Sequence, residues 1–353
     1  MTSSLYLGTS KGVAVLRSED GRKWELANQA LQSWAVPMVA VSPSAPNRVY
    51  AGTRGDGVWV SEDFGTSWKK PSFGHRGPGK CRCVAVDPSD PNTVYAGTEP
   101  IDLFVSHDGA ASWERVDALW DVPWVGQVDY PPGRPTNAIE PHVRDIAVNP
   151  KDPDTVLIGL QVGYMLKTTN GGVSWDVLNQ DLDADVHSIV IDPSHPSRVW
   201  IATGGDYARA GLADGKALYR SENGGANWEP MAMDEFPDHE YSVPIVVNPQ
   251  DPRILYSSVA SGPPSSWAKN PNGASGLVIR SKDAGTSWEN LTAALPVQTK
   301  QLAQAMAVNP TEPNNVFLAF RGGTLCLSDD GGDTWRAMDV EVGNVEDMKA
   351  VTA

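Results

Sequence analysis

One eight-residue phrase recurs along the chain and constrains the fold more than any other feature. It reads SEDFGTSW at Ser61–Trp68 and returns as SHDGAASW, TTNGGVSW, SENGGANW, SKDAGTSW and SDDGGDTW. A shorter copy, SEDGRKW, ends at Trp24. The 353 residues therefore repeat one unit seven times, which predicts a repeat architecture rather than two unrelated domains.

A second phrase alternates with the first. VAVSPSAPNRVYAGT, VAVDPSDPNTVYAGT, IAVNPKDPDTVLIGL, IVIDPSHPSRVWIAT, IVVNPQDPRILYSSV and MAVNPTEPNNVFLAF each predict a β-branched strand, a proline-rich turn and a second strand. A third strand ends in the eight-residue phrase, and a fourth begins at its tryptophan. The tryptophans that mark the units are Trp24, Trp68, Trp113, Trp175, Trp228, Trp288 and Trp335.

Four antiparallel strands per unit, repeated at this period, are the sequence signature of a β-propeller. The chain opens with SLYLGTS, GVAVLRSED and KWELANQ, so the first unit lacks its inner strand, and VEDMKAVTA at the other end matches the missing strand. We predict an all-β fold in which residues 1–353 form a single seven-bladed β-propeller. One blade is closed by the N- and C-terminal strands, which leaves no open sheet edge.

The phrase S-x-D-x-G-x-[ST]-W is the Asp-box, and on it the chain resembles the Asp-box (BNR-repeat) β-propeller superfamily over essentially its whole length. That superfamily includes sialidases, xyloglucanases, sortilin-type receptors and photosystem II assembly factors, and the chain is similar to bacterial BNR-repeat proteins that resemble glycosyl hydrolases. The resemblance implies the fold but leaves the chemistry open. The chain departs from sialidases, because it has seven units rather than six and no Arg-Ile-Pro motif near its start.

The Asp-box itself predicts a turn and not an active site. We expect Asp63 to accept hydrogen bonds from turn amides, Gly65 to adopt a positive φ and Trp68 to pack between blades. Asn170 and Asn223 replace the aspartate in two copies, which a turn tolerates and a catalytic acid does not. Function is therefore expected on the opposite face, where the inner strands begin.

Composition limits the partners. The 28 basic and 43 acidic side chains give a formal charge of −15, which argues against nucleic-acid binding. No segment has the unbroken apolar length of a membrane span, and MTSSLYLGTSKG lacks the regions of a leader. Three cysteines, Cys81, Cys83 and Cys326, fit a reducing compartment. We expect a cytoplasmic protein with no nucleic-acid or membrane partner.

Polar side chains gather where the inner strands begin. Alignment of these strands on their proline turns places seven residues at one level: Pro37, Arg82, Arg144, His187, Val243, Gln304 and Asp347. Two positions further out, on the same side of each strand, stand Ala35, Lys80, His142, Asp185, Tyr241 and Leu302. We predict a polar pocket at this end of the propeller axis, open to a small-molecule substrate.

Histidines from three consecutive blades fall in this region and allow two interpretations. In the first, they converge with Asp185 or Glu240 around a divalent metal, or one of them acts as a general base. In the second, they line a wet channel, since no HxH or HxxxH spacing marks a metal site. The candidate metal ligands are His142, His187 and His239, and the candidate catalytic residues are His187, His142, Asp185 and Tyr241.

Basic residues in the same region predict an anion site in an otherwise acidic protein. Lys80, Arg82 and Arg144 lie on adjacent blades, with Arg54 and Arg321 on loops between second and third strands, and such a group suits a carboxylate or a phosphate. The alternative is internal pairing with nearby aspartates. The candidate substrate-binding residues are Arg82, Arg144, Lys80, Gln304, Arg321, Trp124 and Tyr207.

Three insertions lengthen the loops on this face, at residues 117–141, 204–216 and 259–276. Their aromatic residues form a stacking surface for a ligand or pack the loops down, and these are Trp120, Trp124, Tyr130, Tyr207 and Trp267. Glycoside hydrolysis needs two carboxylates beside the scissile bond. No spacing singles out a pair among Glu99, Asp102, Asp121, Asp129, Glu140, Asp145 and Asp206.

Two functions follow from these features. The first is a propeller enzyme, a hydrolase or lyase resembling glycoside hydrolases, that acts on a small polar, anionic or glycosidic substrate, with metal assistance through histidines left open. The second is a non-catalytic propeller, similar to the assembly factors, that uses the same face to bind a protein partner. An enzyme requires a concave pocket with converging side chains, whereas a binding module requires a flatter rim and a filled channel.

Overall fold

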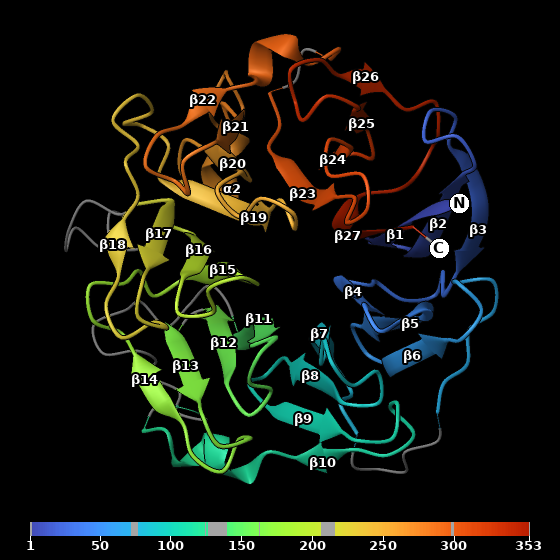
Figure 1. Ribbon diagram of the computed structural model, residues 1–353, viewed down its shortest axis with the longest axis vertical. Coiled ribbons are helices and arrows are strands. Elements are labelled where there is room, and N and C mark those ends of the chain that lie inside the picture. Colours follow the sequence, from blue (N-terminus) through green and yellow to red (C-terminus); the bar gives the residue numbers. More distant parts are fainter. Residues whose placement is uncertain are drawn as a thin grey trace.

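The computed structural model describes residues 2–71, 77–123, 125, 140–161, 163–205, 216–297 and 300–352. Their strands form seven small sheets in a ring around a central axis (Figure 1). Each sheet is one blade, and we number the blades from 1, which holds both termini, to 7. The predicted seven-bladed β-propeller is confirmed. No helix in these ranges is long and apolar enough to cross a membrane.

The inner strand of each blade lies next to the axis (Figure 1). From blade 1 to blade 7 the inner strands are β27 (Val345–Thr352), β4 (Met38–Ser42), β7 (Cys81–Val86), β11 (His142–Val148), β15 (Val186–Ile191), β19 (Tyr241–Val247) and β23 (Ala303–Val308). Consecutive inner strands contact one another around the whole ring. Their side chains therefore form the wall of the axial channel.

The second and third strands of each blade form its buried middle. The second strands are β1 (Ser3–Thr9), β5 (Ala45–Thr53), β8 (Val94–Thr98), β12 (Val156–Gln161), β16 (Val199–Thr203), β20 (Leu255–Ala260) and β24 (Val316–Phe320). The third strands are β2 (Gly12–Ser18), β6 (Gly57–Ser61), β9 (Leu103–Ser106), β13 (Met165–Thr168), β17 (Leu218–Ser221), β21 (Leu277–Ser281) and β25 (Leu325–Ser328). Because each sheet packs on a blade at either side, these strands are buried along most of their length.

The outer strands are short. They are β3 (Glu25–Ala30), β10 (Glu114–Arg115), β14 (Asp176–Leu178), β18 (Glu229–Pro230), β22 (Glu289–Asn290) and β26 (Arg336–Ala337). In blade 2 the fourth strand expected after Trp68 is reduced, within the described residues, to a single bridge between Val60 and Lys69. Pro71 follows two residues later and has no N–H to extend a ladder. The short helical segments are η1 (Asp117–Asp121), α2 (Pro264–Trp267) and η2 (Thr292–Ala294).

The C-terminal strand closes the ring as predicted. β27 runs antiparallel to β1, from the pair Ser3 and Thr352 to the pair Gly8 and Asp347, and both termini lie at blade 1 (Figure 1). Met348 of β27 is buried in a core shared with blade 7. Closure thus joins the two ends of the chain through both backbone pairing and core packing.

The Asp-box turn uses its polar atoms internally. The Ser61 hydroxyl donates to Asp63 Oδ1 (2.8 Å) and accepts the Gly65 N–H (2.8 Å). The N–H and hydroxyl of Ser67 both donate to the Asp63 carboxylate, at 2.8 and 2.6 Å. These bonds from Ser67 hold the pKa of Asp63 at about 2. Gly65 has a φ of 79°, so the motif is a turn whose acid is occupied by its own chain.

The asparagine copies repeat this arrangement. Asn170 Oδ1 accepts the Ser174 N–H (3.0 Å), and its Nδ2 donates to the Ser174 hydroxyl (2.9 Å). The Asp-box also bonds to the proline turn of its own blade, as where Gly109 N–H donates to the Asn92 carbonyl (2.9 Å). Asp-boxes and proline turns therefore share one face of the propeller, opposite the ends where the inner strands begin.

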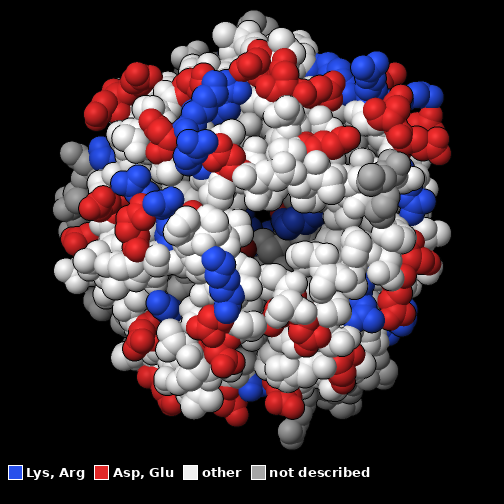
Figure 2. All heavy atoms as spheres, viewed as in Figure 1, with Lys and Arg blue, Asp and Glu red and all other residues white. Residues whose placement is uncertain are grey.

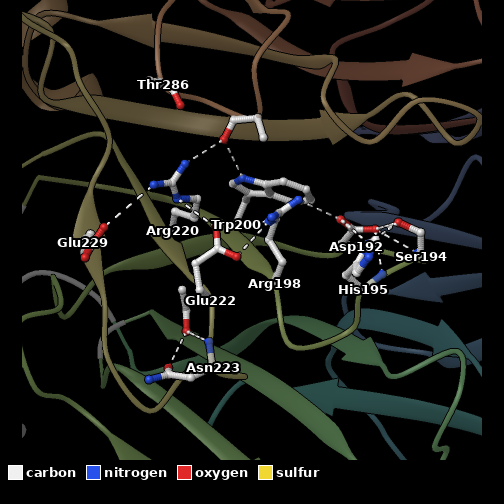
Figure 3. Close-up of polar contacts among 12 residues, drawn as sticks. Asp192, Ser194, His195, Arg198, Trp200, Arg220, Glu222, Asn223, Glu229 and Thr286 are labelled. Atoms are coloured by element: carbon white, nitrogen blue, oxygen red, sulfur yellow. Dashed lines mark hydrogen bonds and ion pairs between the residues drawn. The ribbon is translucent and has the colours of Figure 1, made fainter.

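Side chains of one blade also bond to the Asp-box of the next. Trp200 of β16 and Arg220 of β17 both donate to the Ala284 carbonyl, at 3.2 and 3.4 Å, in the turn of blade 6 (Figure 3). The same contact recurs at other junctions, through the pairs Lys167 with Gly224 and Arg280 with Gly331. The Asp-box face is thus occupied by contacts that fasten neighbouring blades together.

Candidate functional site

Side chains reach the axis where the inner strands are bulged, close to their first residues; we call this end of the channel the mouth. β11 shifts register between Val143 and Asp145, which leaves Arg144 outside its ladder with β12. The same shift occurs in other inner strands, at Arg82 of β7, His187 of β15 and Gln304 of β23. A bulge bends the strand and re-aims the extra side chain. The predicted polar ring is therefore largely a ring of β-bulges.

One member of the predicted ring belongs to another level. Asp347 pairs with Gly8, as Asp145 pairs with Gly159, so these two aspartates occupy the same position in their blades. The residue outside the ladder in β27 is Glu346. The assignment of Asp347 to the Arg144 level was wrong by one residue, because β27 has no proline turn on which to align it.

The seven inner strands enclose an axial cavity of about 470 Å³. Figure 2 shows the hollow at the centre of the molecule with a basic side chain inside it. The polar lining residues include Arg144, Asp145, His187, Ser188, Gln304, Glu346, Asp347 and Lys349, and much of the remaining wall is Val, Ile and Ala. The channel is thus a concave pocket with convergent polar groups, and its volume suits a small ligand.

Asp145 faces this cavity from β11. One of its carboxylate oxygens accepts the backbone N–H of Ile189 in the next blade (2.7 Å), and the other accepts the N–H of Ile146 (2.9 Å). Burial raises the pKa of Asp145 to about 6, although both hydrogen bonds act in the opposite direction. A carboxyl group with this pKa can hold or release a proton near neutral pH.

Asp347 faces the same cavity from the opposite wall, since blade 1 and blade 4 lie on opposite sides of the ring (Figure 1). Its Oδ2 accepts the backbone N–H of Val39 in the next blade (3.0 Å). Lys349 Nζ donates to both carboxylate oxygens, at 2.7 and 2.9 Å. The charge of Asp347 raises the pKa of Asp145 and that of Lys349 lowers it. The cavity therefore holds two electrostatically coupled carboxyl groups in unlike environments.

His142 and Arg82 form a buried pair at the mouth. His142 Nδ1 donates to the Glu140 carbonyl (2.9 Å), which leaves its Nε2 as the acceptor for Arg82 Nη2 (2.8 Å). Burial, with the charge of Arg82, lowers the pKa of His142 to about 3. Both ring nitrogens are occupied, so the geometry does not favour His142 as a base or a metal ligand. It acts instead as a neutral acceptor that orients Arg82.

The other predicted anion-binding residues are spread over the mouth. Arg144 lines the cavity, and its buried Nε has no hydrogen-bond partner among the described residues. Gln304 lines the cavity from blade 7. Lys80 is exposed at the rim, with Nζ 3.9 Å from a carboxylate oxygen of Glu140, and Arg321 is exposed on the loop between β24 and β25. The structure thus brings Arg144 and Gln304, but not Arg321, to the cavity.

Of the four candidate catalytic residues, His187, Asp185 and Tyr241 lie together. His187 Nδ1 donates to the Ser242 carbonyl (2.6 Å), and its Nε2 lies 3.2 Å from Asp185 Oδ1. The imidazole packs edge to face on Tyr241, which packs in the same way on Trp267. His187 also lines the cavity. This cluster supports the cavity wall between blades 5 and 6.

The predicted metal site finds no support in the described residues. None of them form a group of three or more His, Cys, Asp or Glu side chains that could hold an ion. His239 Nε2 bonds to the Ser275 carbonyl (3.0 Å), and the two other candidate histidines also use one nitrogen on a backbone carbonyl. Each histidine is thus bound by its own blade or by its neighbour.

Part of the predicted aromatic surface lies outside the described residues, namely Trp124, Tyr130 and Tyr207. Trp120 is described, and 42% of it is exposed. Its Nε1 donates to Asp102 Oδ1 (3.2 Å), and its ring lies 4.6 Å from the Arg115 guanidinium. Trp120 is therefore held in place at the surface of blade 3, by contacts that do not include the cavity.

The sequence interpretation missed the pairing of Asp145 with Asp347 and the part of Lys349. The signal is present once the register is right, because VRDIAV and VEDMKAV then align with an aspartate directly after the bulged residue in both. Lys349 follows two positions later, and the two-residue period of a strand returns it to the same side as Asp347.

Comparison with known proteins agrees with this architecture. No model of a known protein family matches the chain. A xyloglucanase of Acetivibrio thermocellus is 26% identical over 225 residues, which cover 55% of this chain and 25% of that protein. A xyloglucanase of a Paenibacillus species is 24% identical over 215 residues, covering 56% and 21%. The chain is an Asp-box propeller related to xyloglucanases. The match spans a quarter or less of these relatives' length.

Solved structures share the fold. The GH74 xyloglucanase from Xanthomonas campestris has a TM-score of 0.64 and 15% identity, covering 98% of this Asp-box propeller and 52% of that chain. YCF48 bound to D1 peptide has a TM-score of 0.59 and 14% identity, covering 92% and 88%. In size, this propeller corresponds to half of the xyloglucanase structure and to most of YCF48.

Proposed function

We propose that this chain is a hydrolase resembling glycoside hydrolases and that it acts on a small polar substrate in the axial cavity. The observation that carries the proposal is the pair of carboxyl groups, Asp145 and Asp347, on opposite walls of that cavity. Glycoside hydrolysis uses one carboxylic acid to protonate the departing oxygen and one carboxylate to activate water or attack the sugar carbon.

The environments of the two groups suggest their roles. Asp145, with a pKa of about 6, keeps its proton into the range where a general acid is useful. Asp347 accepts two hydrogen bonds from Lys349, and we assign it the part of base or nucleophile. In the inverting form of the reaction, Asp145 gives its proton to the glycosidic oxygen as the carbon–oxygen bond breaks. Water bonds to the sugar carbon and gives its proton to Asp347.

The other cavity residues would hold the substrate. Arg144 and Gln304 offer hydrogen-bond donors from blades 4 and 7, and His187 contributes to the wall with Asp185 and Tyr241 behind it. We assign no proton transfer to His142, because its acceptor nitrogen is taken by a guanidinium. We assign no step to a metal ion.

The relationship to xyloglucanases supports hydrolase chemistry, and the cavity argues for a smaller substrate than a polysaccharide. Those relatives are named for xyloglucan, and the solved xyloglucanase is about twice the size of this propeller. A cavity of about 470 Å³ on the axis of one propeller has room for a small glycoside. The proposed substrate is therefore a small glycoside or a similar polar molecule.

The test is hydrolysis of a panel of nitrophenyl glycosides, with neutral and acidic sugars, by the wild-type chain and by Asp145→Asn and Asp347→Asn. We expect each substitution to reduce kcat by about 10²-fold or more, the usual contribution of general acid–base catalysis. Asp108→Asn is the matched control, because it lies in an Asp-box where asparagine occurs naturally in two copies. The proposal would be overturned if Asp145→Asn and Asp347→Asn were as active as Asp108→Asn. It would also be overturned if the wild-type chain hydrolysed no glycoside of the panel.

A peptide-binding propeller is the second candidate, and the size match to YCF48 favours it. The solved YCF48 carries a D1 peptide and is covered over 88% of its length by this chain. Fluorescence anisotropy with that labelled peptide tests the idea directly. Saturable binding that is unchanged by Asp145→Asn would support a peptide site separate from the cavity, and no binding would remove this candidate.

A further inference from the structure

We propose that Arg54, Arg82 and Arg144 form a binding site for a small oxyanion at the mouth of the axial cavity. The site would take a carboxylate or a phosphate group, since guanidinium groups match the planar geometry and charge of both. It goes beyond the proposed hydrolase activity, because anion binding does not require that any bond be broken.

Arg82 is the central member and is nine-tenths buried. It is 8% exposed, its Nε has no hydrogen-bond partner among the described residues, and its Nη1 lies 3.4 Å from Glu99. The charges of Arg144 and Arg54, after burial itself, lower the pKa of Arg82 to about 10. Glu99 offsets one of the three positive charges, so the unused Nε donor of Arg82 and the remaining charges of the cluster favour the binding of a further anion.

Arg144 and Arg54 complete the site from either side. Arg144 is the bulged residue of the next inner strand, and its buried Nε is also without a partner in the described ranges. Arg54 pairs with Lys80 in an antiparallel bridge, two residues before Arg82 on β7, and is exposed. The site therefore has two buried donors and one solvent-facing charge at its entrance.

Among the described residues, the nearby carboxylates do not fully neutralise the three arginines. Glu99 contacts Arg82, whereas Glu140 lies nearest to Lys80, at 3.9 Å. Asp185 is the third nearby carboxylate, and its Oδ1 lies 3.2 Å from His187 Nε2. His142 is neutral and accepts from Arg82. In the part of the mouth that the structure describes, positive charge is therefore in excess, although the net charge of the chain is −15, and a site for an anion requires such an excess.

Two properties of Arg144→Gln would distinguish a ligand site from a structural one. Without a ligand, the substitution removes a like charge from beside Arg82, so we expect the melting temperature to rise or stay unchanged. With a ligand, it removes a charge-assisted hydrogen bond, so we expect the affinity for the anion to fall about tenfold or more. A residue that only stabilised the fold would lower the melting temperature when replaced.

The experiment is a titration of the folded chain with inorganic phosphate and with glucuronate at constant ionic strength. Binding is measured by calorimetry and by the shifts of the arginine Nε–H signals in NMR spectra. Glucose is the uncharged control ligand, and Arg253→Gln, on the opposite face, is the control variant. We expect saturable binding of at least one anion, shifts at Arg82 and Arg144, and no response to glucose. Binding to neither anion, binding unchanged in Arg144→Gln, or a melting temperature lowered by that substitution would overturn the proposal. A chain that binds the anions but hydrolyses no glycoside would keep this site and remove the hydrolase.

Discussion

His142 and His187 show how neighbours decide what a residue at the mouth can do. Both donate Nδ1–H to a backbone carbonyl, at 2.9 and 2.6 Å. The second nitrogen of His142 then meets a guanidinium, which keeps the ring neutral, whereas that of His187 meets the carboxylate of Asp185. The same residue type therefore accepts a hydrogen bond from a guanidinium in one blade and lies beside a carboxylate in the next.

Asp145 gives the clearest prediction at this scale. Selective ¹³C labelling of aspartate should show a carboxyl that titrates near pH 6. Asp347→Asn removes a nearby negative charge and should lower the pKa of Asp145, while Lys349→Gln removes a positive charge and should raise it, each by ~0.5 unit or more. Shifts in the opposite directions, or none, would contradict the electrostatic coupling across the cavity.

The raised pKa of Asp145 also determines how the stability of the fold changes with pH. The folded state binds the Asp145 proton more tightly than the unfolded state does, because its pKa of about 6 exceeds the 3.8 of an unperturbed aspartate. The contribution of this group to the free energy of unfolding therefore declines as the pH rises from about 4 to about 6. In Asp145→Asn this part of the pH dependence should disappear, which chemical denaturation at a series of pH values will detect.

Two kinds of element have distinct roles: the Asp-box turns bond neighbouring blades to one another, and the β-bulges orient the side chains of the proposed site. Arg280 of β21 shows the coupling: its side chain is 4% exposed and donates to Glu289, to Asp333 and to the Gly331 carbonyl of the next blade. The bulges at the other end of the inner strands carry Arg82, Arg144 and His187. The contacts that fasten the blades and the proposed site therefore lie at opposite ends of the same blades.

Arg280→Met should lower the free energy of unfolding by about 1–3 kcal/mol, because it removes the hydrogen bonds that Arg280 donates to Glu289, Asp333 and the Gly331 carbonyl. Tyr256 remains as a donor to the Gly331 carbonyl, and Lys282 remains as a partner of Glu289. Arg253→Met is the control, since the Arg253 side chain is exposed and its described contacts are with Asp251. We expect a change within about 0.5 kcal/mol. Urea denaturation measures both. Equal effects in the two variants would contradict the role of Arg280 in fastening blades.

Sequence periodicity was sufficient for the blades and not for the site. The strand phrases and the tryptophans of the Asp-boxes identified seven units and the closing strand, because each pattern states a local rule that repeats. No repeated sequence pattern marks the β-bulges. The sequence therefore assigns Asp347 to the bulged position, which Glu346 occupies. The Nε2 atom of His142 accepts a hydrogen bond from Arg82, which is 60 residues away in the sequence. A local sequence pattern cannot predict a contact between residues so far apart. The part of Lys349 is shown by its hydrogen bond to Asp347 in the structure.

At the scale of the whole molecule, the closing strand β27 both stabilises the ring and forms part of the cavity wall. β27 supplies Asp347 and Lys349 to the cavity wall and Met348 to the core. It also covers the edge of β1 with an antiparallel ladder. Loss of this strand would open the ring and remove one side of the proposed site.

Deletion of residues 345–353 should therefore prevent stable folding or lower the melting temperature steeply, because it exposes the β1 edge and part of the blade 1 core. A synthetic peptide of residues 345–353 should restore part of the loss. Lys349→Gln, which keeps the strand, is the control and should leave the melting temperature nearly unchanged. A truncated chain that unfolds at the wild-type temperature would contradict the account of closure.

The central claim is that function resides in the axial cavity and not on the repeated Asp-box face. A crystal structure of the chain soaked with glucuronate tests it most directly. We predict that the sugar lies in the axial cavity, with its carboxylate at Arg82 and Arg144 and its ring between Asp145 and Asp347. Ligand density at the Asp-boxes, or an empty cavity under conditions where the chain binds the sugar in solution, would contradict the claim.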